Sequence, residues 1–170
     1  MRRIVVSFLV LVLLGGVMAA PIAAHPTSNY CADPQEQAFL NKINAYRAKK
    51  GLSPLASSQT LGAAADHHSI DMATKNYFSH TLKGGLSWSQ NVKNHGYTAS
   101  PTMGENIAAG NADALATFKQ WKTSPEHNKN MLSKNYKAIG IGRAYHTNGK
   151  YGWYWTTDFG GAADGAAKTC

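Results

Sequence analysis

The sequence predicts a single α+β domain, in which a mostly helical body is followed by an antiparallel hairpin. Three observations predict this class. Apolar residues recur every three or four positions through the body of the chain, as they do on one face of a helix. Towards the end the period changes to two, and Asn148-Gly149 supplies a tight turn between two alternating segments. At 170 residues the chain is long enough for one sizeable core and too short for two.

Helix starts and stops divide the region before the hairpin. Asp33-Pro34-Gln35-Glu36 has the N-cap, the proline and the glutamate of a capping box, and Gly51 supplies a stop. Residues 94–111 are rich in Gly, Ala, Ser and Asn, which predicts a loop. Further helices are expected from Ser57 or Ser58, around Trp88 and Val92, over 112–122, and after Ser124-Pro125-Glu126.

Composition and charge exclude several classes of protein. A hydrophobic content of 44% is too high for a disordered chain, and no repeat of solenoid period is present. The formal net charge is +8, but the lysines and arginines are scattered instead of forming a dense arm. We therefore expect no nucleic-acid binding, and a weak attraction to anionic envelope polymers or lipid head groups stays an alternative.

The first 24 residues have the parts of a secretory signal peptide. Arg2 and Arg3 precede the apolar run 4–14, and small residues follow between Ala19 and Ala24. A membrane anchor is the alternative, but the run is shorter than the roughly 20 apolar residues that a spanning helix needs. We expect cleavage between Ala19 and Ala24, and a secreted, extracellular protein with no transmembrane segment.

The two cysteines fit an exported chain. Cys31 and Cys170 have no second cysteine two or three positions away, which makes each a poor metal ligand. In an oxidising compartment they can pair, provided that the ends of the domain lie close together. We expect this disulfide, and we divide the mature chain into a lead over 25–34, a domain over 35–162 and a tail over 163–170.

Glu105 is the glutamate without a structural explanation. Glu36 belongs to the capping box, and Glu126 lies in the first turn of a short helix, where its charge interacts well with the helix dipole. Glu105 lies among small residues and is expected to be buried or to line a cleft. His80 and His127 each lie where an element ends and can converge with it, although spacing alone does not show that they meet.

Other motifs of catalysis are missing from the sequence. It contains no His-Glu-x-x-His, no Gly-x-Ser-x-Gly and no phosphate-binding glycine loop, and neither cysteine has the setting of a catalytic thiol. His68 lies on the apolar face of the second predicted helix, and we interpret it as a histidine at the edge of the core.

A series of short blocks follows in order between residues 35 and 160. They occupy residues 39–47, 51–55, 68–73, 77–80, 104–107, 121–132, 139–142 and 154–160. Among them are Tyr77-Phe78-Ser79-His80, Gly104-Glu105-Asn106-Ile107 and Ser124-Pro125-x-His127. Together the blocks resemble the SCP domain, which defines the CAP superfamily of cysteine-rich secretory, antigen 5 and pathogenesis-related proteins.

The resemblance implies an α-β-α sandwich with a central cleft, in which two histidines and two glutamates can hold a divalent cation, often zinc. By position, His80 and His127 match the two histidines and Glu105 matches one glutamate. Ser124 stands where the second glutamate is expected, as in the short bacterial branch, and Glu126 is nearby in the sequence. The implied metal ligands are therefore His80, Glu105 and His127, and a water could complete a tetrahedral zinc site.

Two functions stay open at this point. The first is a monomeric, non-enzymatic extracellular binding module, whose cleft takes a divalent cation, an apolar or lipid-like ligand, or a segment of a partner. A lipid or sterol, or an anionic envelope polymer, is its expected partner. The alternative is a zinc-dependent hydrolase of extracellular peptide or ester bonds, because zinc acidifies its bound water. Ser124 in place of a carboxylate removes the spare general base that such an enzyme would use.

Overall fold

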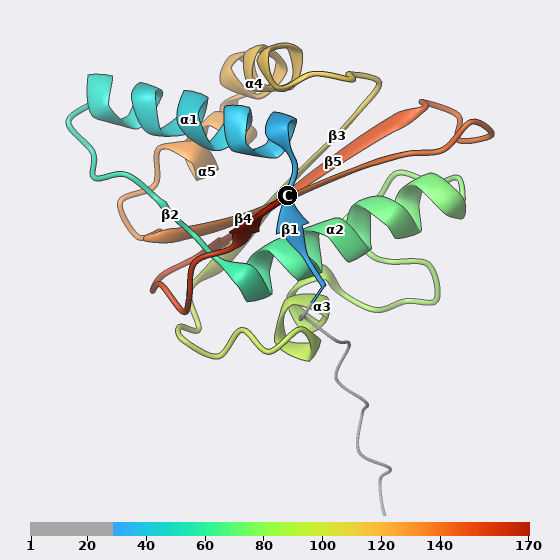
Figure 1. Ribbon diagram of the computed structural model, residues 1–170, viewed down its shortest axis with the longest axis horizontal. Helices are drawn as coiled ribbons and strands as arrows, with labels where there is room; N and C mark the ends of the chain where they lie inside the picture. The colour runs from blue at the N-terminus through green and yellow to red at the C-terminus, as the bar shows by residue number, and fades with distance from the viewer. Residues whose placement is uncertain (1–28) are drawn as a thin grey trace, which may run out of the picture.

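The fold is a β-sheet between two layers of helices (Figure 1). We describe residues 29–170 of a computed structural model; the expected signal peptide and residues 25–28 of the lead lie outside the described residues. One layer contains α1 (Pro34–Lys49), α4 (Ala114–Thr123) and α5 (Pro125–Met131), and the other contains α2 (Gln59–Thr74) and α3 (Trp88–Asn94). The α+β class and the three-layer arrangement agree with the prediction.

Four strands form the central sheet, and the three long ones are antiparallel. The two long strands that come last in the chain form the predicted hairpin, and a turn over residues 146–152 that contains Asn148-Gly149 joins them. The fourth strand is short, lies at one edge of the sheet and pairs in parallel with the first strand of the hairpin. In spatial order the strands are β2 (Ala56–Ser57), β4 (Ala138–Tyr145), β5 (Trp153–Gly160) and β3 (Met103–Ala109).

The helix starts follow the local capping rules. Asp33 Oδ1 accepts hydrogen bonds from the N–H groups of Gln35 at 2.7 Å and Glu36 at 2.9 Å, and Glu36 Oε2 accepts from the Asp33 N–H at 2.9 Å. This reciprocal pair is the capping box expected at the start of α1. Ser58 caps α2 through its hydroxyl, which accepts from the Leu61 N–H.

The prediction of a loop over residues 94–111 is wrong at its centre, where β3 lies. Small residues have low intrinsic strand propensity, so the segment resembled a loop in the sequence. In the fold, β3 pairs with β5 along its whole length, and Gly104 to Ala108 are all buried. The segment is therefore a fully paired strand, and it places Glu105 on a rigid element.

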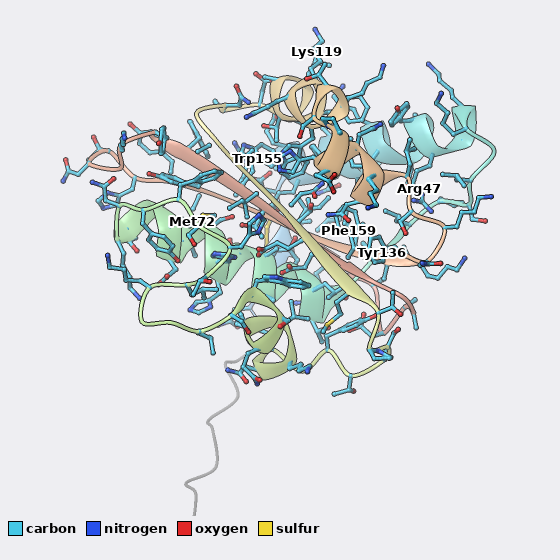
Figure 2. The ribbon with its side chains drawn as sticks, turned by 180° about the vertical axis from the view of Figure 1, so that it is seen from behind. Arg47, Met72, Lys119, Tyr136, Trp155 and Phe159 are labelled. Carbon is cyan, nitrogen blue, oxygen red and sulfur yellow. A yellow bond between two sulfur atoms is a disulfide. The ribbon has the colours of Figure 1, made fainter. Side chains whose placement is uncertain are left out.

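Close packing of α2 on the sheet depends on two glycines of β4. A Cβ atom at Gly140 would lie 2.0 Å from the carbonyl carbon of Leu61, and one at Gly142 would lie 2.2 Å from the amide nitrogen of Asp66. No side chain fits in that space, because the obstacles are backbone atoms. On the other face of the sheet, Trp155 and Phe159 pack with residues of α1 and α4 (Figure 2).

A disulfide joins the two ends of the described chain. Cys31 and Cys170 are bonded, with their Cα atoms 5.2 Å apart, which confirms the predicted pairing. Next to the bond, β1 (Cys31–Ala32) and β6 (Lys168–Thr169) form a small parallel sheet of their own. Among residues 29–170, no helix has both the length and the apolar character that a bilayer crossing requires.

Candidate functional site

Two imidazoles hold the carboxylate of Glu105. The Glu105 side chain is 1% exposed, and its Oε2 lies 2.6 Å from Nδ1 of His68, a fully buried residue of α2. Its Oε1 lies 2.6 Å from Nδ1 of His80, whose side chain is 54% exposed. Both carboxylate oxygens are therefore engaged by histidines, one inside the protein and one at its surface.

The hydrogen bonds of His68 fix how many protons the buried pair holds. Nε2 of His68 lies 3.0 Å from the carbonyl oxygen of Ser79, which can only accept, so this nitrogen carries a hydrogen. A further proton must then lie between Nδ1 of His68 and Oε2 of Glu105. His68 therefore bridges the Ser79 carbonyl and the Glu105 carboxylate through its two ring nitrogens.

His80 presents the accessible part of this cluster. Its hydrogen bond with Glu105 raises the pKa of His80, partial burial opposes that change, and the charge of the carboxylate adds to the increase. Because Nδ1 is engaged with Glu105, Nε2 is the ring nitrogen left for a ligand or for proton transfer. A histidine oriented by a buried carboxylate is a common arrangement for a general base.

Asparagine side chains tie α5 to the strand that carries Glu105. Asn130 Nδ2 donates to the Glu105 carbonyl oxygen at 3.1 Å and to Asn106 Oδ1 at 2.8 Å. Asn106 Nδ2 donates in turn to the carbonyl oxygen of His127 at 3.1 Å. These bonds fix the backbone of His127 beside the edge of the sheet.

His127 lies close enough to His80 to respond to its charge. Burial lowers the pKa of His127, and the positive charge of His80 lowers it further. The His127 ring packs against Trp121, with 5.8 Å between the ring centroids. Its Nδ1 is buried and has no hydrogen-bond partner among the described residues. Burial and the charge of His80 thus both favour the neutral imidazole of His127.

A second buried carboxyl group lies next to Glu105, on the neighbouring strand. Asp158 of β5 is the strand partner of Glu105, and it is 1% exposed. Both of its carboxylate oxygens lack a hydrogen-bond partner among the described residues. Burial raises its pKa well above the ordinary range, and the nearby charge of Glu105 raises it further. Both effects favour the neutral, protonated form of Asp158.

Comparison with known protein families shows which family contains this cluster. A sequence profile of the cysteine-rich secretory protein family, abbreviated CAP, matches residues 40–159. That span contains every residue of the histidine–carboxylate cluster. The chain belongs to the CAP family. The resemblance seen in the sequence blocks is thereby confirmed.

Several relatives of this CAP-family chain are bacterial. The uncharacterised protein YkwD of Bacillus subtilis is 35% identical over 145 residues, which cover 82% of this chain and 54% of YkwD. The uncharacterised membrane protein YlbC of the same species is 35% identical over 114 residues, which cover 66% of this chain and 33% of YlbC. The chain thus spans about half the length, or less, of these curated relatives.

Solved structures share the CAP fold. An extracellular protein containing an SCP domain from Bacillus anthracis has 29% identity and a TM-score of 0.64, over 72% of this chain and 39% of that one. An outer surface protein from Borrelia burgdorferi has 22% identity and a TM-score of 0.66, over 74% and 91% of the two chains. At 22% identity the second likeness shows the fold alone.

The two remaining residues predicted for the cleft lie outside the cluster's hydrogen bonds. Ser124 is the junction of α4 and α5: its N–H donates to the Trp121 carbonyl oxygen, and its own carbonyl accepts from the Asn128 N–H. The Glu126 side chain is 85% exposed and lies 4.0 Å from Lys129 Nζ, as expected for an acid in the first turn of α5.

The CAP cluster in this arrangement does not fit a three-ligand zinc site. Both oxygens of Glu105 lie 2.6 Å from a ring nitrogen, one of His68 and one of His80, so His80 meets the carboxylate directly through Nδ1 and not across a shared metal. Within residues 29–170, no group of three or more His, Cys, Asp or Glu side chains is placed to hold a metal ion. We therefore derive no chemical step through a metal.

Sequence reasoning missed two members of the cluster. His68 was interpreted as a core-edge histidine; it is buried, but it also holds Glu105. Its place in the block 68–73, just before the block that ends in His80, was the available signal. Asp158 had no local signal, because its relation to Glu105 comes from the pairing of β3 with β5.

A groove between α1 and α4 is the second candidate site of this CAP domain. Its volume is about 250 Å³, and its apolar lining includes Leu115, which is 45% exposed. Tyr46 and Phe118 contact each other edge to face at 5.7 Å, and the Lys122 ammonium lies 5.2 Å from the Tyr46 ring centroid. The lining combines aromatic and aliphatic side chains with three lysines: Tyr46, Leu115, Phe118, Lys42, Lys49 and Lys122.

Proposed function

We propose that this CAP-family protein is an exported, non-enzymatic binding module that holds an anionic amphiphile in the groove between α1 and α4. The observation that carries the proposal is the combination of apolar side chains and three lysines in the lining of one groove. An apolar chain would cover Leu115 and Phe118, and the lysines would attract a carboxylate or phosphate head group. The lipid-like ligand that we expected in the central cleft from the sequence would then bind in this groove instead.

The energetics favour a ligand with both parts. Covering an exposed leucine side chain contributes about 1 kcal/mol or more, at roughly 25 cal/mol per Å² of apolar surface. Ion pairs at an exposed site contribute about 0–1 kcal/mol each and weaken with salt. Neither part alone gives strong binding, so we expect an amphiphile to bind more tightly than either a hydrocarbon or a simple anion.

Export is part of the proposal. The basic start and apolar run of residues 1–24 and the disulfide between Cys31 and Cys170 support it. The Bacillus anthracis relative is described as an extracellular protein, which also supports it. Outside the cell the protein would meet fatty acids, lipid head groups and anionic envelope polymers.

A titration with laurate tests the binding proposal. We expect saturable binding by calorimetry, weakened by about tenfold in Leu115→Gln and severalfold in Lys122→Gln. Lys119→Gln is the matched control, because Lys119 is on the same helix and does not line the groove. Dodecanol, which has the chain without the charge, should bind more weakly than laurate. Equal affinities of wild type and Leu115→Gln would overturn the proposal.

A hydrolase is the second candidate, and one observation favours it. His80 is half exposed and is oriented by the buried Glu105, as a general base would be. The test is hydrolysis of a chromogenic ester and of a peptide, with and without added zinc, by wild type and by His80→Gln. We expect no difference between the two proteins. Turnover that is lost in His80→Gln would establish the enzyme in place of the binding module.

A further inference from the structure

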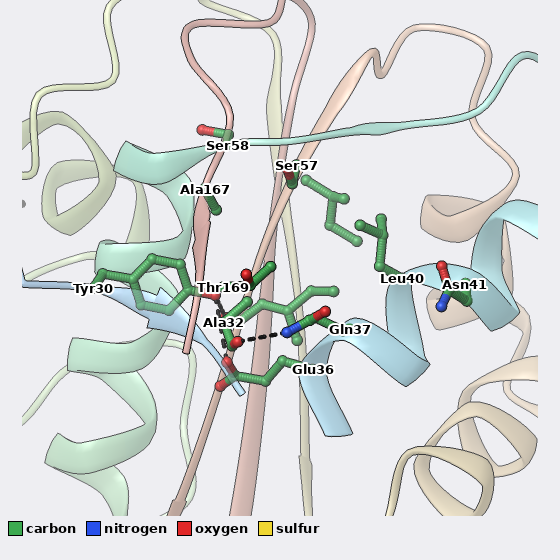
Figure 3. A pocket seen from close by; sticks show the side chains of 12 residues that line it. Tyr30, Ala32, Glu36, Gln37, Leu40, Asn41, Ser57, Ser58, Ala167 and Thr169 are labelled. Carbon is green, nitrogen blue, oxygen red and sulfur yellow. Dashed lines mark hydrogen bonds between the residues drawn. The ribbon is translucent and has the colours of Figure 1, made fainter. Parts of the chain in front are cut away.

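A cavity of about 130 Å³ lies beneath the start of α1, away from both candidate sites (Figure 3). It is lined by α1 on one side and by β4 on the other, where Leu40, Ile139 and Ile141 contribute aliphatic side chains. The ring of Tyr30 and the terminal residues Ala167 and Thr169 also line it. It shares no lining residue with the groove between α1 and α4.

The main buried polar groups around this cavity are already satisfied by the protein. The Tyr30 hydroxyl donates to the carbonyl oxygen of Ile141. Glu36 Oε1 accepts from the Arg143 N–H at 2.8 Å, and Glu36 Oε2 accepts from the Asp33 N–H at 2.9 Å. Since buried water is held by polar groups that lack other partners, these groups do not call for a water in the cavity.

The Gln37 side chain is likewise hydrogen-bonded within the protein. Its Nε2 donates to the Ala32 carbonyl oxygen at 2.9 Å, across the side of the cavity (Figure 3). Glu36 itself has little charge to offer a ligand near neutral pH, because burial raises its pKa to about 8. The aliphatic lining, the internal hydrogen bonds and the uncharged carboxyl group together select against an ion.

We propose that this cavity binds a small, neutral, apolar molecule about the size of a benzene ring. A cavity of about 150 Å³ lined by aliphatic and aromatic side chains stays dry in water and binds benzene or xenon. The volume here is close to that size. Two of its lining residues, Asn41 and Thr169, are exposed, so the cavity reaches the surface and a ligand can enter without unfolding the core.

The C-terminal segment covers part of this cavity and is fastened in place. The Cys170 N–H donates to the Ala32 carbonyl oxygen, β6 pairs with β1, and the disulfide joins the same two segments. The Gln59 N–H also donates to the Gly165 carbonyl oxygen. A bound molecule should therefore exchange slowly while the disulfide is intact, and faster in the double variant Cys31→Ser with Cys170→Ser.

Benzene is the probe, and ¹H–¹⁵N correlation spectra of the full chain give the readout. We expect saturable shifts of the amides of Leu40, Ile139 and Ile141. Ser57→Leu, which places a larger side chain in the cavity, should weaken binding by about tenfold or more. Ala56→Leu is the matched control, because Ala56 is exposed, lies next in the same strand and does not line the cavity. Its affinity should stay within about twofold of wild type.

Two results would overturn the proposal. The first is the absence of saturable shifts in wild type, which would make the cavity a packing gap only. The second is equal affinity of wild type and Ser57→Leu, which would place benzene elsewhere. If Ser57→Leu does not fold, Ala167→Leu fills the cavity from the C-terminal segment and replaces it in the comparison. Failure of laurate to bind the groove would leave this result unaffected, because the two sites are separate.

Discussion

The buried Glu36 should make the stability of the protein fall as the pH rises from 5 to 8. Glu36 is 3% exposed, and burial raises its pKa from the ordinary 4.5 to about 8, with the charge of Asp33 adding to the increase. In this pH range the folded state holds a proton that the unfolded state has lost. The contribution of Glu36 to the free energy of unfolding is therefore fully present below about pH 4.5, and it is lost as the pH rises through about 8.

The size of the effect follows from the two pKa values. One pKa unit corresponds to 1.36 kcal/mol, so a change from 4.5 to about 8 is worth on the order of 5 kcal/mol when the titration is complete. A small domain has about 5–15 kcal/mol of stability in total, so the loss is a large part of it. Burial also raises the pKa of Asp66 to about 6, and the bond with Glu105 raises that of His80, both with the same sign.

Replacement of Glu36 by glutamine isolates its share. Urea unfolding, followed by tryptophan fluorescence at pH 5, 6, 7 and 8, gives the free energy of unfolding at each pH. Glu36→Gln should be less stable than wild type at pH 5, by about 1–2 kcal/mol, because its amide group cannot accept both backbone N–H bonds. Its stability should then change much less with pH than that of wild type.

Glu126→Gln serves as the control, since its carboxylate is 85% exposed and its removal should leave the pH dependence unchanged. The reasoning is refuted if Glu36→Gln and wild type lose the same free energy between pH 5 and pH 8. That result would mean that Glu36 is ionised in the folded protein and that other groups cause the dependence.

Four further variants test the close packing of glycines, the disulfide and the hydrogen bonds of a buried arginine. Gly142→Ala should lower the free energy of unfolding in urea by about 3 kcal/mol or more, because the added Cβ would meet the backbone of α2. Gly161→Ala should lower it by about 1 kcal/mol, because there the added Cβ would meet the movable Ser100 hydroxyl. The double variant Cys31→Ser with Cys170→Ser should lose about 5 kcal/mol, the loop-closure value for a sequence separation of 139; a loss below about 2 kcal/mol would contradict this. Arg47→Lys should raise the unfolding rate and lower the free energy of unfolding by about 2 kcal/mol, because the guanidinium donates to three carbonyl oxygens. An unchanged melting temperature by calorimetry would show that these hydrogen bonds do not stabilise the fold.

Features with local causes could be predicted from the sequence. The capping box at Asp33 involves four consecutive residues, and the hairpin around Asn148-Gly149 follows from alternation and a turn. The disulfide was predicted because only two cysteines exist and both lie at the ends of the domain. Each of these signals can be found without knowing which distant segments touch.

The features that were missed depend on distant contacts. The strand that contains Glu105 has small residues, and its burial depends on β5, which lies about fifty residues later in the chain. His68 is separated from Glu105 by 37 positions, and its ring reaches the carboxylate because Gly140 and Gly142 let α2 approach the sheet. Asp158 looks like one more alternating strand residue until the register places it opposite Glu105.

The bond between Cys31 and Cys170 turns everything between them into one covalent ring. A protease that cuts the hairpin turn near Lys150 would open this ring once without separating any piece from the rest. Such a nicked molecule would stay in one piece and fall into two fragments only when a thiol is added. Durability against a single cleavage would suit the exported protein proposed above, which would work among extracellular proteases.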